Sequence, residues 1–384
     1  MKSRPVVAIG LVALAVLCLL GGLGYAAMES SRQVTLPPPI GPHRVGRVLF
    51  DWTDASRVDP FAPGHAIRRE LPVLVWYPAD PAPGSTPTSY LPEGWTAALG
   101  GGSLNILETS TTNIHPHAVA QAPVASDTSR YPVLVFAPGI GLQASDYTTL
   151  AEDLASHGYV VAGIDPTYST NVVLSGGRVV RAVPKAGDNA DYNRLVAVWA
   201  QDMRFVTNQM RALDATSGGM FFSRLDIAKM GLFGHSAGGA AATLACRSTV
   251  WCGGAADLDG DLAGSVVQTG LGKPFLFLGD GRAFAREPYL KEMLRGVLRG
   301  VPADTGFVLT VAGAHHDSFT DRGLYFNVFA LRGTVVGSIN PTRALRIAGV
   351  YLRTFFRASL QGKTSALLED SHSPYPEVRI VSVK

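Results

Sequence analysis

A single Gly-His-Ser-Ala-Gly motif at residues 234–238 constrains the fold of this chain more than any other feature. It lies between a short apolar run, 230–233, and a stretch of small residues, 239–246, that is typical of a helix. A G-x-S-x-G motif between a strand and a helix forms a sharp turn that exposes the serine hydroxyl at the end of the sheet. The sequence therefore predicts that Ser236 is a nucleophile that attacks an acyl carbon.

Strand-like and helix-like patterns alternate along the chain from residue 132 onward. This alternation predicts an α/β fold of the α/β-hydrolase type, with a doubly wound, mostly parallel sheet and helices on both faces. The strand at 71–76 is bounded by Pro72 and Pro78, so we expect it at a sheet edge. The predicted strands are 45–50, 71–76, 133–136, 160–164, 229–233, 253–258, 275–278 and 307–311, and the predicted helices are 145–157, 191–213, 239–246, 289–299 and 344–357.

The N-terminus differs in character from the rest of the chain. Lys2 and Arg4 precede an uncharged apolar stretch that ends at Met28 and has about the length of a spanning helix, roughly 20 residues. We expect residues 1–28 to be a membrane anchor or a signal segment, with the catalytic domain outside the cell membrane or secreted. Residues 29–43 contain three consecutive prolines and predict a stiff spacer, and residues 44–384 predict the hydrolase domain.

The composition limits the partners of this protein. The formal net charge is only +3 in 384 residues and no long basic block occurs, which argues against nucleic acid as a partner. Hydrophobic residues make up 47% of the chain, enough for a large core. Because export would place the domain in an oxidising compartment, we expect a disulfide between Cys246 and Cys252.

Two neighbouring histidines are candidates for the base that activates the serine. A serine hydroxyl is a weak nucleophile until a base takes its proton. His315 and His316 follow the predicted strand 307–311, where the late histidine of this fold belongs, while His235 inside the motif is expected to pack. Adjacent histidines cannot easily face one ion, so we predict no metal site and no cofactor.

Four aspartates are candidates for the acid that orients the histidine. Asp257, Asp259 and Asp261 stand at the end of one predicted strand, and Asp280 follows the next. Such an acid holds the imidazole in the correct tautomer and stabilises the imidazolium. The residues alone leave these candidates open.

Backbone N–H groups are expected to bind the oxyanion of the tetrahedral intermediate. Ala237, directly after the nucleophile, supplies one of them. The other is expected from the loop after strand 133–136, from either Gly139 or Ile140, because Pro138 has no N–H group.

Six pieces of the sequence follow one another in a specific order: 69–78, 131–141, 153–161, 234–239, 258–260 and 313–319. In this order they resemble the platelet-activating factor acetylhydrolase family of the plasma, phospholipase A2-like type, with its bacterial relatives. The resemblance implies ester hydrolysis without a metal, the triad Ser236, Asp259 and His316, and the oxyanion donors Ile140 and Ala237. The chain has Pro138 where the family commonly has a histidine, and its segment 80–130 has no clear counterpart. The phospholipid substrate is therefore not carried over.

These observations together predict a serine hydrolase. We expect it to cleave a carboxylic ester of a lipid or a small molecule, with short or oxidised acyl groups, through an acyl-enzyme. One alternative is an acyltransferase to a cell-envelope acceptor that uses the same triad, and another is a non-catalytic binding protein on the hydrolase fold. Within the triad, His315 remains an alternative base, and Asp280 and Asp257 remain alternative acids.

Overall fold

The computed structural model describes most of the chain. Its described ranges are 4–64, 67–99, 108–128, 130–184, 191–282, 288–326, 333, 335–363, 366–369 and 373–382. The side chains of residues 4–9, 26, 366 and 369 are outside this description.

A ten-stranded sheet runs through the centre of the molecule in the order β14-β13-β12-β11-β10-β6-β7-β3-β2-β5. From β13 to β7 neighbouring strands are parallel. The pairs β13–β14, β7–β3 and β3–β2 are antiparallel, and β5 pairs with β2 in parallel. The parallel strands are apolar on both faces because helices cover both sides of them. The strands span Arg44–Val58 (β2), Arg68–Ala79 (β3), Val119–Ala120 (β5), Tyr131–Ala137 (β6), Val160–Ile164 (β7), Leu225–His235 (β10), Cys252–Leu258 (β11), Phe275–Asp280 (β12), Gly306–Val311 (β13) and Val378–Ile380 (β14).

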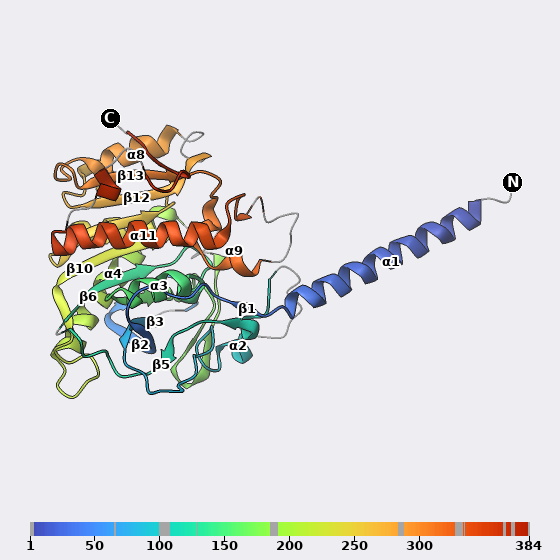
Figure 1. Ribbon diagram of the computed structural model, residues 1–384, viewed down its shortest axis with the longest axis horizontal. Coiled ribbons are helices and arrows are strands. Elements are labelled where there is room, and N and C mark those ends of the chain that lie inside the picture. The colour runs from blue at the N-terminus through green and yellow to red at the C-terminus, as the bar shows by residue number, and fades with distance from the viewer. Residues whose placement is uncertain are drawn as a thin grey trace.

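Helices cover both faces of this sheet, as the sequence predicted. Helices α3 (Thr148–Ser156) and α11 (Pro341–Gln361) lie on one face, where α11 crosses the front of the molecule in Figure 1. Helices α4 (Tyr192–Ala215), α5 (Ala237–Ser248) and α8 (Pro288–Leu298) pack into the core on the other face. Their starts follow local rules: the Asp191 and Asn340 side chains cap α4 and α11. The α/β-hydrolase fold class is thus confirmed.

Short elements connect these layers. A two-stranded pair joins β1 to β4, and another joins β8 to β9. The short elements are Val34–Thr35 (β1), Trp95–Ala98 (α2), Thr111–Asn113 (η1), Ile114–His115 (β4), Ala144–Tyr147 (η2), Val172–Leu174 (β8), Ser175–Gly177 (η3), Arg178–Val180 (β9), Ser265–Thr269 (α6), His316–Phe319 (η5), Arg322–Tyr325 (α9) and Ala366–Glu369 (α12).

Strand β3, which contains the predicted strand 71–76, lies inside the sheet between β7 and β2. The prediction that this strand lies at a sheet edge is therefore wrong. Its ladder with β7 covers only Val73 to Trp76, and the two prolines stand outside that stretch. The carbonyl of Pro72 still accepts a hydrogen bond, from the Asp165 N–H. Prolines that bracket a short ladder therefore do not force a strand to the edge.

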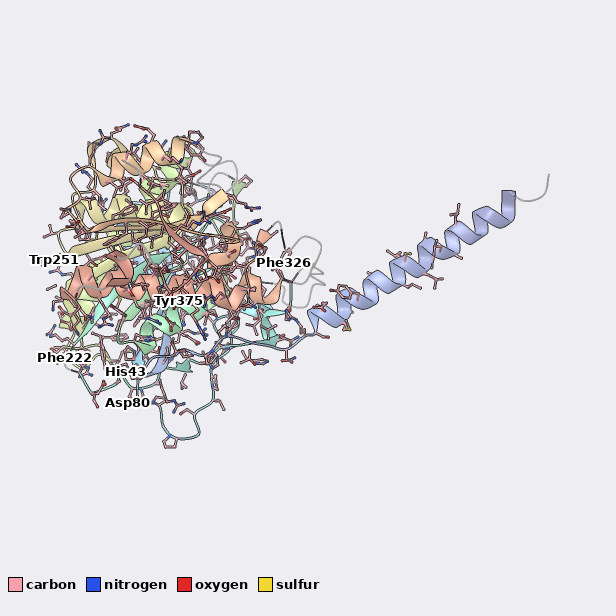
Figure 2. The ribbon with its side chains drawn as sticks, turned by 45° about the horizontal axis from the view of Figure 1, so that its top comes forward. His43, Asp80, Phe222, Trp251, Phe326 and Tyr375 are labelled. Atoms are coloured by element: carbon pink, nitrogen blue, oxygen red, sulfur yellow. A yellow bond between two sulfur atoms is a disulfide. The ribbon has the colours of Figure 1, made fainter. Side chains whose placement is uncertain are left out.

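The N-terminal helix α1 (Arg4–Ser30) projects from the body of the molecule (Figures 1 and 2). From Gly10 to Ser30 it is long and apolar enough to cross a membrane, and this stretch is not buried against the rest of the chain. A signal sequence passes the same test of length and composition.

The segment after α1 is packed against the hydrolase domain, whereas the sequence predicted a spacer. Strand β1 pairs with β4, and the Val34 and Leu36 side chains are buried. The Gly41 N–H donates to the Ser156 hydroxyl at 3.0 Å. The prolines at 37–39 suggested a free chain, but the apolar residues before them give this segment a reason to bind the domain.

The Cys246–Cys252 disulfide is present, as predicted. It joins the last full turn of α5 to the first residue of β11, with a Cα–Cα separation of 5.3 Å. The bridge therefore fixes the helix that follows the Ser236 turn to the next strand of the sheet. Cys18 is a free, exposed cysteine on α1.

Candidate active site

Ser236 stands on a strained turn between β10 and α5. Its backbone has φ 56° and ψ −128°, a conformation that residues with a side chain rarely adopt outside functional sites. The Ser236 N–H donates to the Leu258 carbonyl at 2.9 Å, which ties the turn to β11. Gly238 is required here, since a Cβ at this position would overlap the Ala137 and Pro138 carbonyls. The turn has the geometry that the motif predicted.

Asp259 and His316 meet beside this turn. The His316 Nδ1 and the Asp259 Oδ2 are 2.8 Å apart, and the other carboxylate oxygen of Asp259 accepts the Asp280 N–H at 2.7 Å. Burial alone would lower the pKa of His316, but the hydrogen bond and the charge of Asp259 raise it above its usual 6.5. The Asp259 carboxylate is thus held from both sides, and the imidazole is ready to take up a proton.

Asp259 is a second strained residue at this site. It follows β11 with φ 55°, in the left-handed region. Most residues that carry a side chain adopt this region only at a cost in free energy. The strained backbone places its carboxylate between β12 and the His316 turn. Two left-handed residues therefore lie within one small region of the molecule.

The alternative acids have other partners. Asp257 is fully buried below the Ser236 turn, where its Oδ1 accepts the Gly260 N–H at 2.8 Å. Burial raises the pKa of Asp257 well above its usual value, although the Gly260 hydrogen bond opposes the shift. The Asp280 carboxylate accepts the Arg282 N–H at 2.8 Å and does not contact His316.

His315, the alternative base, is buried on the other side of its turn. Its N–H donates to the Ser318 hydroxyl at 2.8 Å, and its ring lies against Gly337. The structure therefore brings His316, and not His315, to Asp259 and to the cavity at Ser236.

A chain of buried hydrogen bonds connects the Ser236 turn, the His316 turn and the loop after β6. This loop carries Gly139 and Ile140 and is here called the oxyanion loop. The Gly139 N–H donates to the Tyr147 hydroxyl at 3.0 Å, and this hydroxyl lies 2.8 Å from His235 Nδ1. On the other side of the ring, His235 Nε2 lies 2.9 Å from the His316 carbonyl. Burial lowers the pKa of His235 well below 6.5, so its ring is neutral and donates from Nε2 while Nδ1 accepts. The sequence predicted packing for His235 and gave no signal for Tyr147.

This chain also separates the two candidate oxyanion donors. The Gly139 N–H is already bonded to Tyr147, whereas the Ile140 N–H has no hydrogen-bond partner among the residues that the structure describes. Ala237 is the first residue of α5, where backbone N–H groups have no acceptor within the helix. The N–H groups of Ile140 and Ala237 are thus available to a ligand.

Ser236, Asp259 and His316 line one cavity of about 340 Å³, here called the serine cavity. Its other walls are Tyr192, Gly260, Asp261, Asp280, Tyr289 and Leu290. Within the described part of the chain the Ser236 hydroxyl forms no hydrogen bond, so it is not yet bonded to His316. Nucleophile–base contacts often tighten only when substrate binds. The side chains that the sequence placed together lie at the same end of the sheet.

A metal site is not formed by the described residues, among which no three His, Cys, Asp or Glu side chains converge. The predicted absence of a cofactor stays a prediction.

Comparison with known proteins places this geometry in a family. A family profile described as platelet-activating factor acetylhydrolase, isoform II, matches residues 28–169. A probable 1-alkyl-2-acetylglycerophosphocholine esterase of Arthroderma benhamiae is 27% identical over 89% of this chain and 92% of that protein. Both matches point to the platelet-activating factor acetylhydrolase family. The resemblance predicted from the sequence is confirmed.

A solved structure of an esterase has the same fold. The ferulic acid esterase from Streptomyces cinnamoneus superimposes with a TM-score of 0.77 and 30% identity, covering 91% of this chain and 99% of that one. The chain is therefore a carboxylic ester hydrolase with the α/β-hydrolase fold. The alternative of a non-catalytic binding protein is not retained.

Proposed function

We propose that this protein is a serine esterase that works through an acyl-enzyme. Ser236 attacks the ester carbon, His316 takes the serine proton and later gives it to the leaving alcohol, and Asp259 orients the imidazole. The observation that carries the proposal is the 2.8 Å contact between Asp259 and His316 in the cavity that Ser236 lines. The raised pKa of His316 favours the imidazolium that forms when Ser236 attacks.

The oxyanion in this mechanism is bound by the N–H groups of Ile140 and Ala237. Both are fixed by the backbone before the reaction, so they stabilise the developing charge without reorganisation. The bond from Gly139 to Tyr147 supports this assignment, because it leaves Ile140 as the donor from its loop. His235 and Tyr147 act as positioning residues, since they hold the oxyanion loop and the His316 turn in one network.

Esters with short acyl groups fit the serine cavity best. A volume of about 340 Å³ lies at the lower end for small-molecule sites, and the name of the Arthroderma benhamiae relative refers to an acetyl ester. A series of p-nitrophenyl esters from acetyl to long-chain acyl groups tests this choice. We expect kcat/KM to be highest for the short members and to fall as the chain lengthens.

The membrane position of the domain is a further part of this proposal. We infer that α1 anchors the protein with its catalytic domain outside, directly at the membrane surface. The Ser110 N–H donates to the Ser30 carbonyl, and Arg32 donates to the Leu324 carbonyl at 2.9 Å, so the end of α1 is bonded to the domain. Alkaline carbonate extraction of membranes tests this inference. An anchored chain stays in the pellet, and a chain released by cleavage appears in the supernatant.

A fluorophosphonate probe tests the proposed mechanism, because it labels only serines that are activated as nucleophiles. We expect wild-type protein to be labelled and the Ser236→Ala variant to remain unlabelled and without esterase activity. Equal labelling of both proteins would contradict the assignment of Ser236.

A further inference from the structure

A second cavity, of about 430 Å³, lies next to the oxyanion loop and has no part in the mechanism above. We call it the polar cavity. Ile140 to Gln143 form one wall, and Thr170 and Asn171 from the loop after β7 form another. The segment 80–130 contributes Tyr90 and Thr111, and the chain after His316 contributes Arg322. Ile140 lines this cavity, and its N–H is a proposed oxyanion donor to a substrate bound at Ser236.

The charged groups of the polar cavity are already paired with one another. Arg322 donates to Glu108 at 2.8 Å and to Asp317 at 2.9 Å. The Asp146 carboxylate accepts the Tyr325 hydroxyl and the Gln143 N–H, both at 2.7 Å. An anionic ligand would approach these carboxylates, and a cationic ligand would compete with Arg322. The cavity therefore favours a ligand without charge.

The remaining polar groups of the cavity are amides and hydroxyls, which both donate and accept hydrogen bonds. Asn171 accepts the Ala182 N–H through Oδ1 at 3.0 Å, and its amide Nδ2 has no partner among the described residues. Thr111, from another segment of the lining, shares one hydrogen bond of 3.3 Å with Thr96. A ligand hydroxyl can accept from the Asn171 amide and donate to a wall oxygen at the same time.

We propose that the polar cavity binds an uncharged, hydroxyl-bearing group of the ester substrate. The proposal rests on the proposed function, because it requires the scissile ester to lie at Ser236 and Ile140. It selects glycerol-like and sugar-like esters over esters of plain alcohols and plain acids. The hydroxyl groups can belong to the alcohol or to the acyl half of the ester, and the experiment separates these two sources.

The test compares esters that differ only in hydroxyl groups. Glyceryl butyrate and propyl butyrate differ in the alcohol, and the methyl esters of glyceric and propionic acid differ in the acyl group. We expect wild-type enzyme to show a kcat/KM about tenfold higher for the hydroxylated member of one pair, which corresponds to one or two good hydrogen bonds. The pair that shows the preference identifies the half that occupies the polar cavity.

Two variants from different segments of the lining locate the preference. Asn171→Leu removes the amide, and we expect it to bring the kcat/KM ratio of the preferred pair close to one. Thr111→Val removes a hydroxyl without changing the side-chain shape, and we expect a loss of a few-fold in this ratio. Circular dichroism melting shows whether each variant is folded, and only folded variants are compared.

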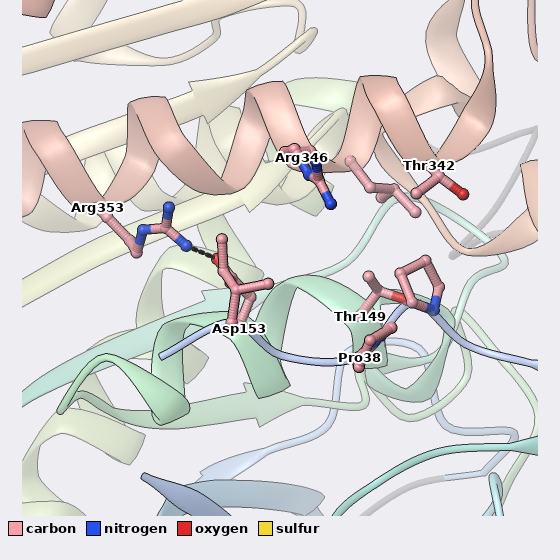
Figure 3. Close-up of a pocket in the computed structure, with 9 residues that line it drawn as sticks. Pro38, Thr149, Asp153, Thr342, Arg346 and Arg353 are labelled. Atoms are coloured by element: carbon pink, nitrogen blue, oxygen red, sulfur yellow. Dashed lines mark hydrogen bonds and ion pairs between the residues drawn. The ribbon is translucent and has the colours of Figure 1, made fainter. Parts of the chain in front are cut away.

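A matched control comes from a different part of the molecule. Thr342 lines a small hollow of about 30 Å³ between α3, α11 and Pro38 (Figure 3), which shares no lining residue with the polar cavity. Thr342→Val is the same chemical change as Thr111→Val, and we expect it to keep the wild-type ratio.

Three results would overturn the proposal. The first is a wild-type ratio near one in both ester pairs. The second is a preference that neither Asn171→Leu nor Thr111→Val changes. The third is a preference for butyrylcholine over glyceryl butyrate that Asn171→Leu abolishes, since it would assign a cation to the cavity. Failure of the proposed function itself has a different signature, namely full hydrolysis of these esters by Ser236→Ala.

Discussion

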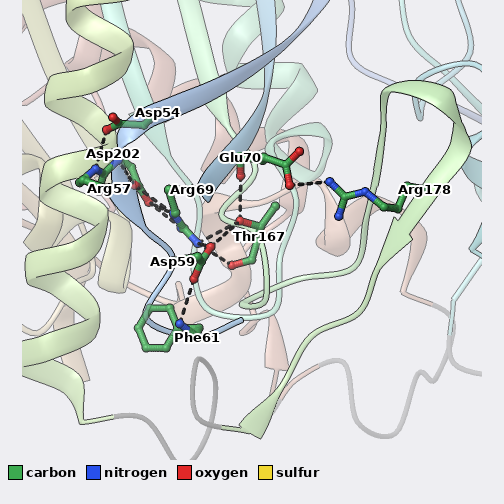
Figure 4. Close-up of polar contacts among 9 residues, drawn as sticks. All are labelled: Asp54, Arg57, Asp59, Phe61, Arg69, Glu70, Thr167, Arg178 and Asp202. Atoms are coloured by element: carbon green, nitrogen blue, oxygen red, sulfur yellow. Dashed lines mark hydrogen bonds and ion pairs between the residues drawn. The ribbon is translucent and has the colours of Figure 1, made fainter. Parts of the chain in front are cut away.

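Two polar regions of this molecule differ in how completely their groups are satisfied. Beyond the carboxyl end of β7, the fully buried Arg69 guanidinium donates to Asp59 at 2.7 Å, to Asp202 at 2.6 Å and to Thr167 (Figure 4). At the candidate site, Ser236 and Asp259 have left-handed backbones, and His316 is half-exposed.

The difference separates polar groups that stabilise this fold from polar groups that are available to a ligand. The Arg69 cluster joins β3 to α4, to the loop after β2 and to the loop after β7, and the guanidinium is fully buried among these partners. The candidate site has strained residues, two available N–H groups and a hydroxyl without a partner. Strain and open hydrogen-bonding capacity are therefore features of the candidate active site.

The largest expected effect is on catalysis at the candidate active site. Asp259→Asn removes the charge that stabilises the imidazolium, and we expect kcat to fall on the order of 10⁴-fold, as when a serine protease loses its triad acid. Steady-state hydrolysis of a p-nitrophenyl ester measures this loss. Asp280→Asn is the control and is expected to change kcat little, because that carboxylate contacts Arg282 and not His316. The reverse pattern would place the acid at the end of β12.

The next largest expected effect is on the stability that the Arg69 cluster provides. Arg69→Met leaves two buried carboxylates without their main partner, and we expect the free energy of unfolding to fall by about 3 to 5 kcal/mol. Denaturant unfolding followed by circular dichroism measures the change. Arg178→Met is the control, because its ion pair with Glu70 is partly exposed and worth at most about 1 kcal/mol. Equal losses in both variants would remove the contrast between buried and surface pairs.

A smaller effect is expected in the hydrogen-bond chain of Tyr147 and His235, which reaches the candidate active site. Tyr147→Phe removes the hydroxyl between Gly139 and His235, and we expect kcat to fall about tenfold while KM changes little. Tyr351→Phe is the control on α11, where the lost partner is the Ser373 hydroxyl. If both variants lose stability but keep kcat, Tyr147 has only a structural role.

The pH dependence of kcat/KM sharpens the same contrast. The base must be neutral to accept the serine proton, and Asp259 raises the pKa of His316 above 6.5. We therefore expect activity to fall as the pH decreases through a value above 6.5. In Asp259→Asn the raising influence is lost and burial lowers the pKa, so the limb of the residual activity moves to lower pH. A limb that stays at the same pH in both proteins would assign it to another group.

Much of the fold could be predicted because it depends on local periodicity. The predicted strand 160–164 coincides with β7, and α4 begins directly after Asp191, the first residue of its predicted range. The position of β3 could not be predicted, because strand order is set by packing between distant segments. The packed segment after α1 was missed for a related reason: Val34 and Leu36 bind a strand that lies about eighty positions later.

The candidate site was predictable in its residue types and less so in its choices. The motif located Ser236 because a turn between a strand and a helix is a local event. The choice of Asp259 over Asp257 depends on side-chain direction at the end of β11, which the residues alone left open. The polar cavity gave no signal at all, since it is built from four segments with weak patterns of their own.

Rapid mixing with an excess of p-nitrophenyl acetate, followed by acid quench and mass spectrometry, tests most directly whether Ser236 carries the chemistry. We predict one acetyl group per chain during turnover, located on the peptide that contains residues 234–238, and none in Ser236→Ala. Steady turnover with no acetylated chain, or an acetyl group on a different residue, would contradict the acyl-enzyme mechanism proposed for this fold.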